Sequence, residues 1–173
     1  PSATATDVTA ELSAIKASSA HMIFTTFSGP VGIPYAKKWG ELKIPAASIG
    51  INVEAQKKGF WKATGGMGNY EATLNTYGRA ELTPITIPFI DKFTQKVGEF
   101  PTYNASTYDA IQILASTIEK AGTLDPPKLV TELEMTNHIG GAGRIAFTKD
   151  HDITWGPGYV TNTGTQWRDG KLI

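Results

Sequence analysis

Two short runs of the sequence decide the fold: Met22-Ile23-Phe24-Thr25-Thr26-Phe27 and Ile44-Pro45-Ala46-Ala47-Ser48-Ile49. Each is a nearly continuous stretch of apolar and β-branched residues, which is typical of a strand covered on both faces in a parallel sheet. Apolar residues at helical spacing precede the first run, from Asp7 to Ser19, and occupy 31–39 between the two runs. This alternation of helix and strand predicts an α/β fold in which helices flank a parallel sheet.

The rest of the chain contains more helices and ends in short strands. A strand is expected over 70–77, and three helices are expected to begin at Thr86, Ser106 and Pro126. Ser106 and Asp109 have the spacing of a capping box, and Gly98 and Gly122 are expected to end the first two helices. Three short strands and the turn signal Asp169-Gly170 then predict a β meander over the C-terminal residues, with the strands at 144–147, 158–161 and 165–167.

Composition excludes several classes of function. The 173 residues fit one ordinary domain, and 16 basic against 16 acidic residues leave no net charge to attract nucleic acid. The absence of cysteine excludes disulfides, zinc-thiolate sites and a thiol nucleophile. No apolar run approaches the roughly 18 residues that cross a membrane, and Pro1 to Thr4 lack the features of a signal peptide. We therefore expect a soluble protein, or a mature part of an exported one.

Candidate catalytic and metal motifs are weak. Asp150-His151-Asp152 is more typical of a turn, because adjacent residues do not converge on one ion and no second cluster supplies ligands. The glycines of 138–143 match neither a dinucleotide fingerprint nor a P-loop and predict a tight turn. No nucleophile elbow of the Gly-x-Ser-x-Gly type occurs. We predict no enzymatic activity, no metal and no cofactor.

One pair of segments has the character of a binding site. Phe27-Ser28-Gly29-Pro30 and Gly50-Ile51-Asn52 are expected to be the loops that follow the two strands. In a parallel sheet such exits gather at one edge, where ligands bind. An aromatic ring, a hydroxyl, backbone amides and a carboxamide suit recognition of a small polar molecule. Ordinary strand-exit turns explain the same residues equally well.

The order and spacing of several segments resemble the C-terminal half of one family. This family is the type 1 periplasmic solute-binding proteins of branched-chain amino acid (Leu/Ile/Val) ABC transporters, and the resemblance covers essentially all 173 residues. It rests on 7–17 followed by 22–27, 27–30 with 48–50, 107–110 leading into 118–122, 150–152 with 156–159, and 166–170.

The resemblance implies part of a two-lobe fold. Residues 1–101 would be a portion of the second ligand-binding lobe, 102–142 helices of the first lobe, and 143–173 a β meander that returns through the hinge. Most of the family's first lobe and the opening strand-helix pair of the second lobe would have no counterpart in this chain. We therefore expect a fragment whose open sheet edges favour self-association.

The resemblance also implies a function without chemistry. The chain would belong to an extracytoplasmic, periplasmic protein that captures an amino acid or small organic acid in an interlobe cleft and delivers it to a membrane permease. The implied ligand contacts are Phe27, Ser28, Asn52 and Tyr108. Amino-acid binders of the family usually carry a carboxylate where Asn52 stands, with Glu54 two residues on, so the ligand class stays open. The alternatives are a ligand-sensing receptor module of the same fold and a flavodoxin-like α/β enzyme.

Overall fold

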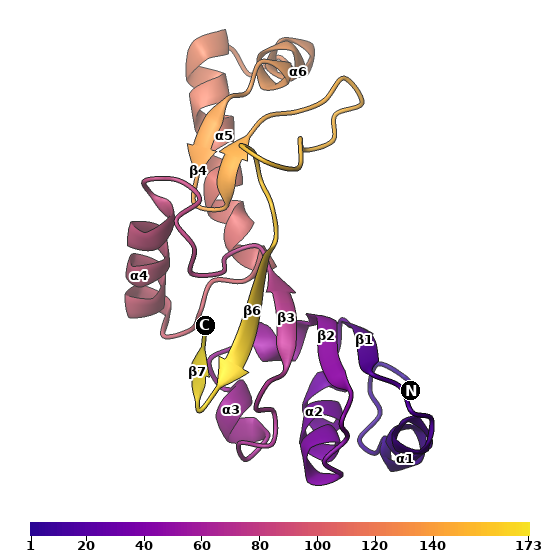
Figure 1. Ribbon diagram of the computed structural model, residues 1–173. Coiled ribbons are helices and arrows are strands. Elements are labelled where there is room, and N and C mark those ends of the chain that lie inside the picture. Colours follow the sequence, from indigo (N-terminus) through magenta and orange to yellow (C-terminus); the bar gives the residue numbers. More distant parts are fainter. The chain divides into compact units, whose positions relative to one another are not determined.

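The computed structural model describes the whole chain, from Pro1 to Ile173, as two compact units (Figure 1). The first unit consists of Pro1–Gly78 and Thr163–Ile173, and the second of residues 79–162. The chain thus passes between the units after Gly78 and after Asn162, whereas the expected boundaries follow residues 101 and 142. The assignment of these segments to family lobes stays a prediction.

The first unit is built on a sheet of five strands in the order β1-β2-β3-β6-β7. The first three strands are parallel, and β6 pairs antiparallel with β3 and with β7. The expected α/β class is therefore confirmed. The elements are α1 (Thr9–Ala17), β1 (Met22–Phe27), α2 (Gly32–Glu41), β2 (Ala47–Asn52), the 3-10 turn η1 (Val53–Gln56), α3 (Phe60–Ala63), β3 (Ala72–Asn75), β6 (Thr163–Arg168) and β7 (Lys171–Leu172).

Strand β2 begins and ends three residues later than its apolar run predicts. Pairing with β1 starts at Met22 opposite Ala47. The residues before it are tied to the end of α2 instead: Ile44 N donates to Trp39 O at 3.3 Å, and Trp39 Nε1 donates to Ala46 O at 3.1 Å. The prediction that Gly50-Ile51-Asn52 form an exit loop is therefore wrong, because these residues complete the strand.

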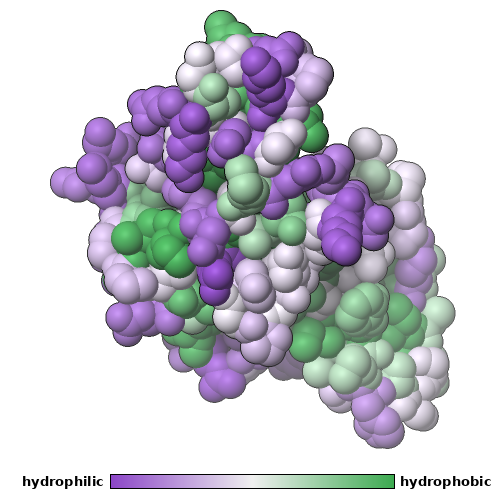
Figure 2. Space-filling view, turned by 90° about the horizontal axis from the view of Figure 1, so that it is seen from above, coloured by the Kyte–Doolittle hydropathy of each residue, from purple (hydrophilic) through white to green (hydrophobic).

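The expectation that both faces of the first two strands are covered is also wrong. One face of β1 and β2 packs against α2, but the other face carries exposed apolar side chains. Met22 is 61% and Phe24 69% exposed, while Ile49 and Ile51 are each 41% exposed. Figure 2 shows hydrophobic residues at the surface on the side where Figure 1 places these strands. Strand β1 is moreover the outer strand of the sheet, with β2 as its one paired neighbour.

The C-terminal hairpin is held to the first unit by Trp167. Its indole is 2% exposed, and Nε1 donates to Ala55 O at 2.7 Å. The Phe60 ring lies 5.6 Å from it, centroid to centroid. The predicted turn is confirmed, because Asp169 and Gly170 have φ angles of 49° and 82°, as a two-residue hairpin turn requires.

The second unit contains the three expected helices and a small hairpin. Gly98 and Gly122 end the first two helices with φ angles of 81° and 62°, as predicted. The capping box is wrong: Ser106 Oγ donates to Tyr103 O at 2.7 Å, and Asp109 binds Gly141 instead. The elements are α4 (Thr86–Val97), η2 (Tyr103–Ala105), α5 (Ser106–Ala121), α6 (Pro126–Glu134), β4 (His138–Gly140) and β5 (Gly143–Ile145).

The strands after residue 143 are divided between two sheets. Strand β5 pairs with β4 in the second unit, while β6 and β7 belong to the first. On α5 the buried side chains are Asp109, Ile113 and Thr117, whereas Ile111 and Leu114 of its apolar face are exposed. None of the helices has the length and hydrophobicity of a membrane-spanning segment.

Candidate functional site

The exits of β1 and β2 lie side by side, as the sequence predicts. Phe27 at the end of β1 is directly paired with Asn52 at the end of β2. Because the two strands are parallel, their carboxyl ends share one edge of the sheet, where ligands of open α/β folds bind. This edge of the first unit is the candidate site.

The turn after β1 presents the accessible groups of this edge. Phe27 is half-buried, and its ring packs edge-on against Tyr35, with centroids 4.8 Å apart. Ser28 is exposed. A Cβ on Gly29 would lie 2.8 Å from Ala3 O, so the close approach of the N-terminal segment requires glycine there. Val31 N donates to the same carbonyl at 3.2 Å, which fixes the turn.

Asn52 lies at the same edge but beneath the surface. Its side chain is fully buried, and Nδ2 donates to Glu71 Oε1 at 2.9 Å and to Gly32 O at 3.3 Å. A Cβ on Gly32 would lie 2.0 Å from Asn52 Oδ1, so the first residue of α2 packs directly on the carboxamide. As placed here, Asn52 offers no exposed atom to a solute, in contrast to its predicted position in a loop.

Glu71 is the most unusual residue near this edge. It precedes β3 and is fully buried, although a carboxylate is costly to bury without a cationic partner. Desolvation raises the pKa of its carboxyl above the ordinary value, and hydrogen bonds from Ser48 and Asn52 oppose part of this rise. Oε2 has no hydrogen-bond partner. Burial therefore favours the uncharged acid more than it would for an exposed glutamate.

The polar network continues from Ser48 to α2. Tyr35 OH and Ser48 Oγ are 2.8 Å apart in the core. Burial raises the pKa of the Tyr35 phenol, and the neighbouring Glu71 adds to this rise. The phenol is therefore uncharged at neutral pH. A chain of buried polar groups thus links α2, β2 and the start of β3.

Two further candidate residues lie apart from this network. Glu54 in η1 forms an ion pair with Lys57, with 2.7 Å between Glu54 Oε1 and Lys57 Nζ, so its carboxylate already has a cationic partner. Tyr108 belongs to the second unit, where its half-exposed ring lies 5.2 Å from that of Phe89. The role of Tyr108 in ligand binding stays a prediction.

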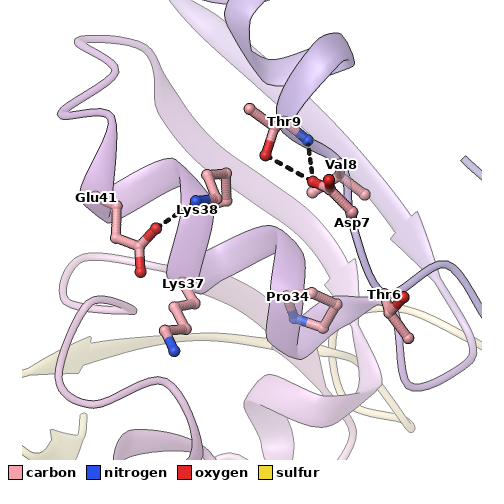
Figure 3. A pocket seen from close by; sticks show the side chains of 8 residues that line it. All are labelled: Thr6, Asp7, Val8, Thr9, Pro34, Lys37, Lys38 and Glu41. Atoms are coloured by element: carbon pink, nitrogen blue, oxygen red, sulfur yellow. Dashed lines mark hydrogen bonds and ion pairs between the residues drawn. The ribbon is translucent and has the colours of Figure 1, made fainter.

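Two cavities of the first unit lie elsewhere. One, of about 280 Å³, is lined by Thr6 to Thr9 and by α2 residues (Figure 3). There Lys38 pairs with Glu41 at 2.6 Å, and Asp7 accepts hydrogen bonds from Thr9 that lower its pKa. Another, of about 590 Å³, lies beside the amino-terminal end of β2. Neither is lined by a predicted site residue, and their lining includes Pro34, Lys37, Trp39, Met67 and Tyr70.

Two motifs that were considered as catalytic or binding sites form turns. His151 N donates to Thr148 O at 3.1 Å, which confirms the turn at 150–152, and its Nε2 lies 2.9 Å from Glu134 Oε1. The glycine-rich segment is the predicted tight turn, between β4 and β5. No group of three acidic or imidazole side chains is placed to hold a metal ion.

Sequence reasoning missed Glu71 and Asn75. Glu71 breaks an otherwise uncharged strand region, and this was the signal that could have found it. Asn75 ends β3 as Asn52 ends β2, and it is also buried, with Oδ1 accepting from Tyr77 N at 3.0 Å. Asparagines at strand ends are signals of turns, because their side chains bond the backbone two residues on.

Comparison with known proteins identifies the family. The periplasmic binding protein family model matches residues 1–170, nearly the whole chain. The chain belongs to this family. A search of curated proteins finds no match.

Solved periplasmic binding proteins share the fold. The leucine-binding protein LivK of Thermotoga maritima superposes with a TM-score of 0.82 at 21% identity, covering 98% of this chain and 48% of that one. LivJ of Streptococcus pneumoniae, in complex with isoleucine, gives 0.80 at 17% identity, covering 98% and 47%. A solute-binding protein of Rhodopseudomonas palustris, in complex with p-hydroxybenzoic acid, gives 0.76 at 21% identity, covering 98% and 48%. The chain therefore spans about half the length of these proteins.

Proposed function

We propose that the chain is part of the solute-binding component of an ABC transporter, and that it contributes one edge of the ligand site. The supporting observation is the pairing of Phe27 with Asn52, which brings two strand exits together in a periplasmic binding protein fold. Phe27 supplies an apolar wall and Ser28 an accessible hydroxyl. Tyr108 remains a candidate contact from the second unit.

We propose an organic acid with an apolar body as the solute. A zwitterionic amino acid needs a carboxylate for its ammonium group, because an unpaired buried charge is costly. At this edge Asn52 is buried and Glu54 is paired with Lys57, so the first unit offers no free carboxylate among the predicted residues. A solute carboxylate could instead accept from Ser28, while Phe27 contacts its apolar part.

We propose a membrane permease as the partner, and the periplasm as the location, in keeping with the family. Enzymatic activity is not part of this proposal. The unpaired edge of β1 and the exposed Phe24 beside it also support self-association of the chain, because an open strand edge without charged residues recruits other strands.

The proposal can be tested by NMR titration of the ¹⁵N-labelled chain with p-hydroxybenzoate, benzoate, leucine and isoleucine. Part of a site binds weakly, so solute concentrations up to about 10 mM are needed, where a Kd of about 1 mM corresponds to about 4 kcal/mol. We expect the amides of Phe27 to Gly29 to shift with the aromatic acids. Ser28→Ala should weaken the shifts, whereas Thr26→Ala, on the exposed face of the same strand, should not. An absence of shifts with every solute would contradict the proposal.

A further inference from the structure

The polar groups around Asn52 and Glu71 are short of hydrogen-bond donors. Glu71 Oε2 and Asn52 Oδ1 are both buried acceptors without a partner. Two side chains of β2 face Glu71: the Ser48 hydroxyl and the Asn52 carboxamide. The Tyr35 phenol of α2 is connected to Glu71 through Ser48. None of them is a cation. A proton on Glu71 converts one surplus acceptor into a donor.

The same cluster is joined to the turn of the candidate site. Asn52 Nδ2 bridges Glu71 Oε1 and Gly32 O, and Gly32 begins α2 directly after the turn that contains Ser28. Gly32 N in turn donates to Gly29 O at 3.4 Å. The carboxamide therefore connects the end of β2, the start of β3 and the residue that closes the turn.

We propose that Asn52 and Glu71 are positioning residues that hold the turn after β1 against the end of β2, and that this clamp requires the uncharged form of Glu71. The inference rests on the proposed function only in treating that turn as part of the solute site. Asn52 then acts through the backbone that presents Ser28, without contact with the solute. Ionisation of Glu71 places an uncompensated charge in the core and loosens the turn.

The clamp has a defined pH dependence. The raised pKa of Glu71 means that the folded chain retains a proton that the unfolded chain has released. Its contribution to stability is complete below the ordinary value of 4.5 and is lost as the pH rises toward the folded pKa. Over that interval the unfolding equilibrium constant rises by up to about tenfold per pH unit. Burial raises the pKa of the Tyr35 phenol further above its already high ordinary value, so that this group stays protonated over the same interval.

Glu71→Gln is the decisive variant, because glutamine has a similar shape and cannot ionise. Urea unfolding of the 173-residue chain would be followed by tryptophan fluorescence from pH 4 to pH 8. We expect the unfolding equilibrium constant of wild type to exceed that of Glu71→Gln by a factor that grows as the pH rises. Glu11→Gln, which removes an exposed carboxylate of α1 in the same unit, should follow wild type. Parallel pH profiles of wild type and Glu71→Gln would overturn the proposal.

Hydrogen exchange separates positioning from general stability. After correction for the intrinsic rate, the amides of Val31 to Ile33 should lose protection with rising pH in wild type but not in Glu71→Gln. The amide of Leu12, which donates to Val8 O in α1, should change less. Equal loss of protection at both places would overturn the positioning role. Neither urea unfolding nor hydrogen exchange uses a solute. A negative NMR titration would therefore contradict the proposed function without affecting the clamp, and negative results for the clamp would not affect the titration.

Discussion

The contact between α2 and Asn52 gives the sharpest prediction about this structure. Gly32 is buried at the first position of α2, and an added methyl group would lie 2.0 Å from Asn52 Oδ1 and 2.8 Å from Cγ. No side chain can be accommodated there without movement of the carboxamide. Gly32→Ala should therefore destabilise the first unit, although alanine normally favours a helix over glycine.

The size of the effect follows from the groups that must move. Overpacking of a closely packed core costs about 1–3 kcal/mol. Displacement of Asn52 also weakens its bonds to Glu71 and to Gly32 O, each worth about 1 kcal/mol. Helix propensity returns at most about 1 kcal/mol. We expect a net loss of about 3 kcal/mol, which lowers the urea midpoint by about 1.5 M at a slope of about 2 kcal/mol/M.

Two further variants make the measurement specific. Gly59→Ala is the control, because nothing lies within 4 Å of the added methyl group and its φ of −73° suits alanine. Its free energy of unfolding should stay within about 0.5 kcal/mol of that of wild type. The double variant Gly32→Ala, Asn52→Ala should be no less stable than Asn52→Ala alone, because the clash partner is gone. A Gly32→Ala midpoint equal to that of wild type would refute the packing of Asn52 beneath α2.

Three other substitutions test separate features of the fold. Trp167→Phe leaves the buried carbonyl of Ala55 without its donor and should lower the free energy of unfolding by about 1–3 kcal/mol; an unchanged urea midpoint would contradict the role of the indole. Phe24→Lys places a charge beside the open edge of β1 and should shift the chain toward monomer in sedimentation velocity, whereas an unaltered distribution would exclude this edge as the contact. Gly98→Ala should cost about 1–2 kcal/mol through its φ of 81° alone, because the added methyl meets nothing within 4 Å.

The helices and their ends follow closely from the sequence. Local signals determine them: the glycines at 98 and 122 end α4 and α5, and the proline at 126 begins α6. The order of the first two strands and their shared edge follow as well, since an alternation of helix and strand leaves few alternatives. These features depend on residues close together in the chain.

Features that depend on distant residues do not follow. The shift of β2 to residues 47–52 arises from pairing with β1 and from the tryptophan at 39, which binds the backbone of Ala46. Apolar content alone predicts the strand three residues too early in the sequence, and therefore predicts Asn52 in a loop. The exposed face of β1 does not follow from the sequence either, because a run of apolar residues does not indicate which side of the sheet is covered.

Under the proposed function, Ser28 would contact the solute, whereas Asn52 would hold the backbone of this edge in place. Both lie at strand exits, yet the hydroxyl is exposed whereas the carboxamide is fully buried and holds the start of α2. A change at Ser28 alters a group that a solute can reach, while a change at Asn52 alters the backbone that presents it. Substitutions at Ser28 and Phe27 should therefore change which solute binds best. Substitutions at Asn52 should weaken the binding of all solutes to a similar degree. Under the proposed clamp, ionisation of Glu71 should disturb the same backbone, because burial disfavours its charged form.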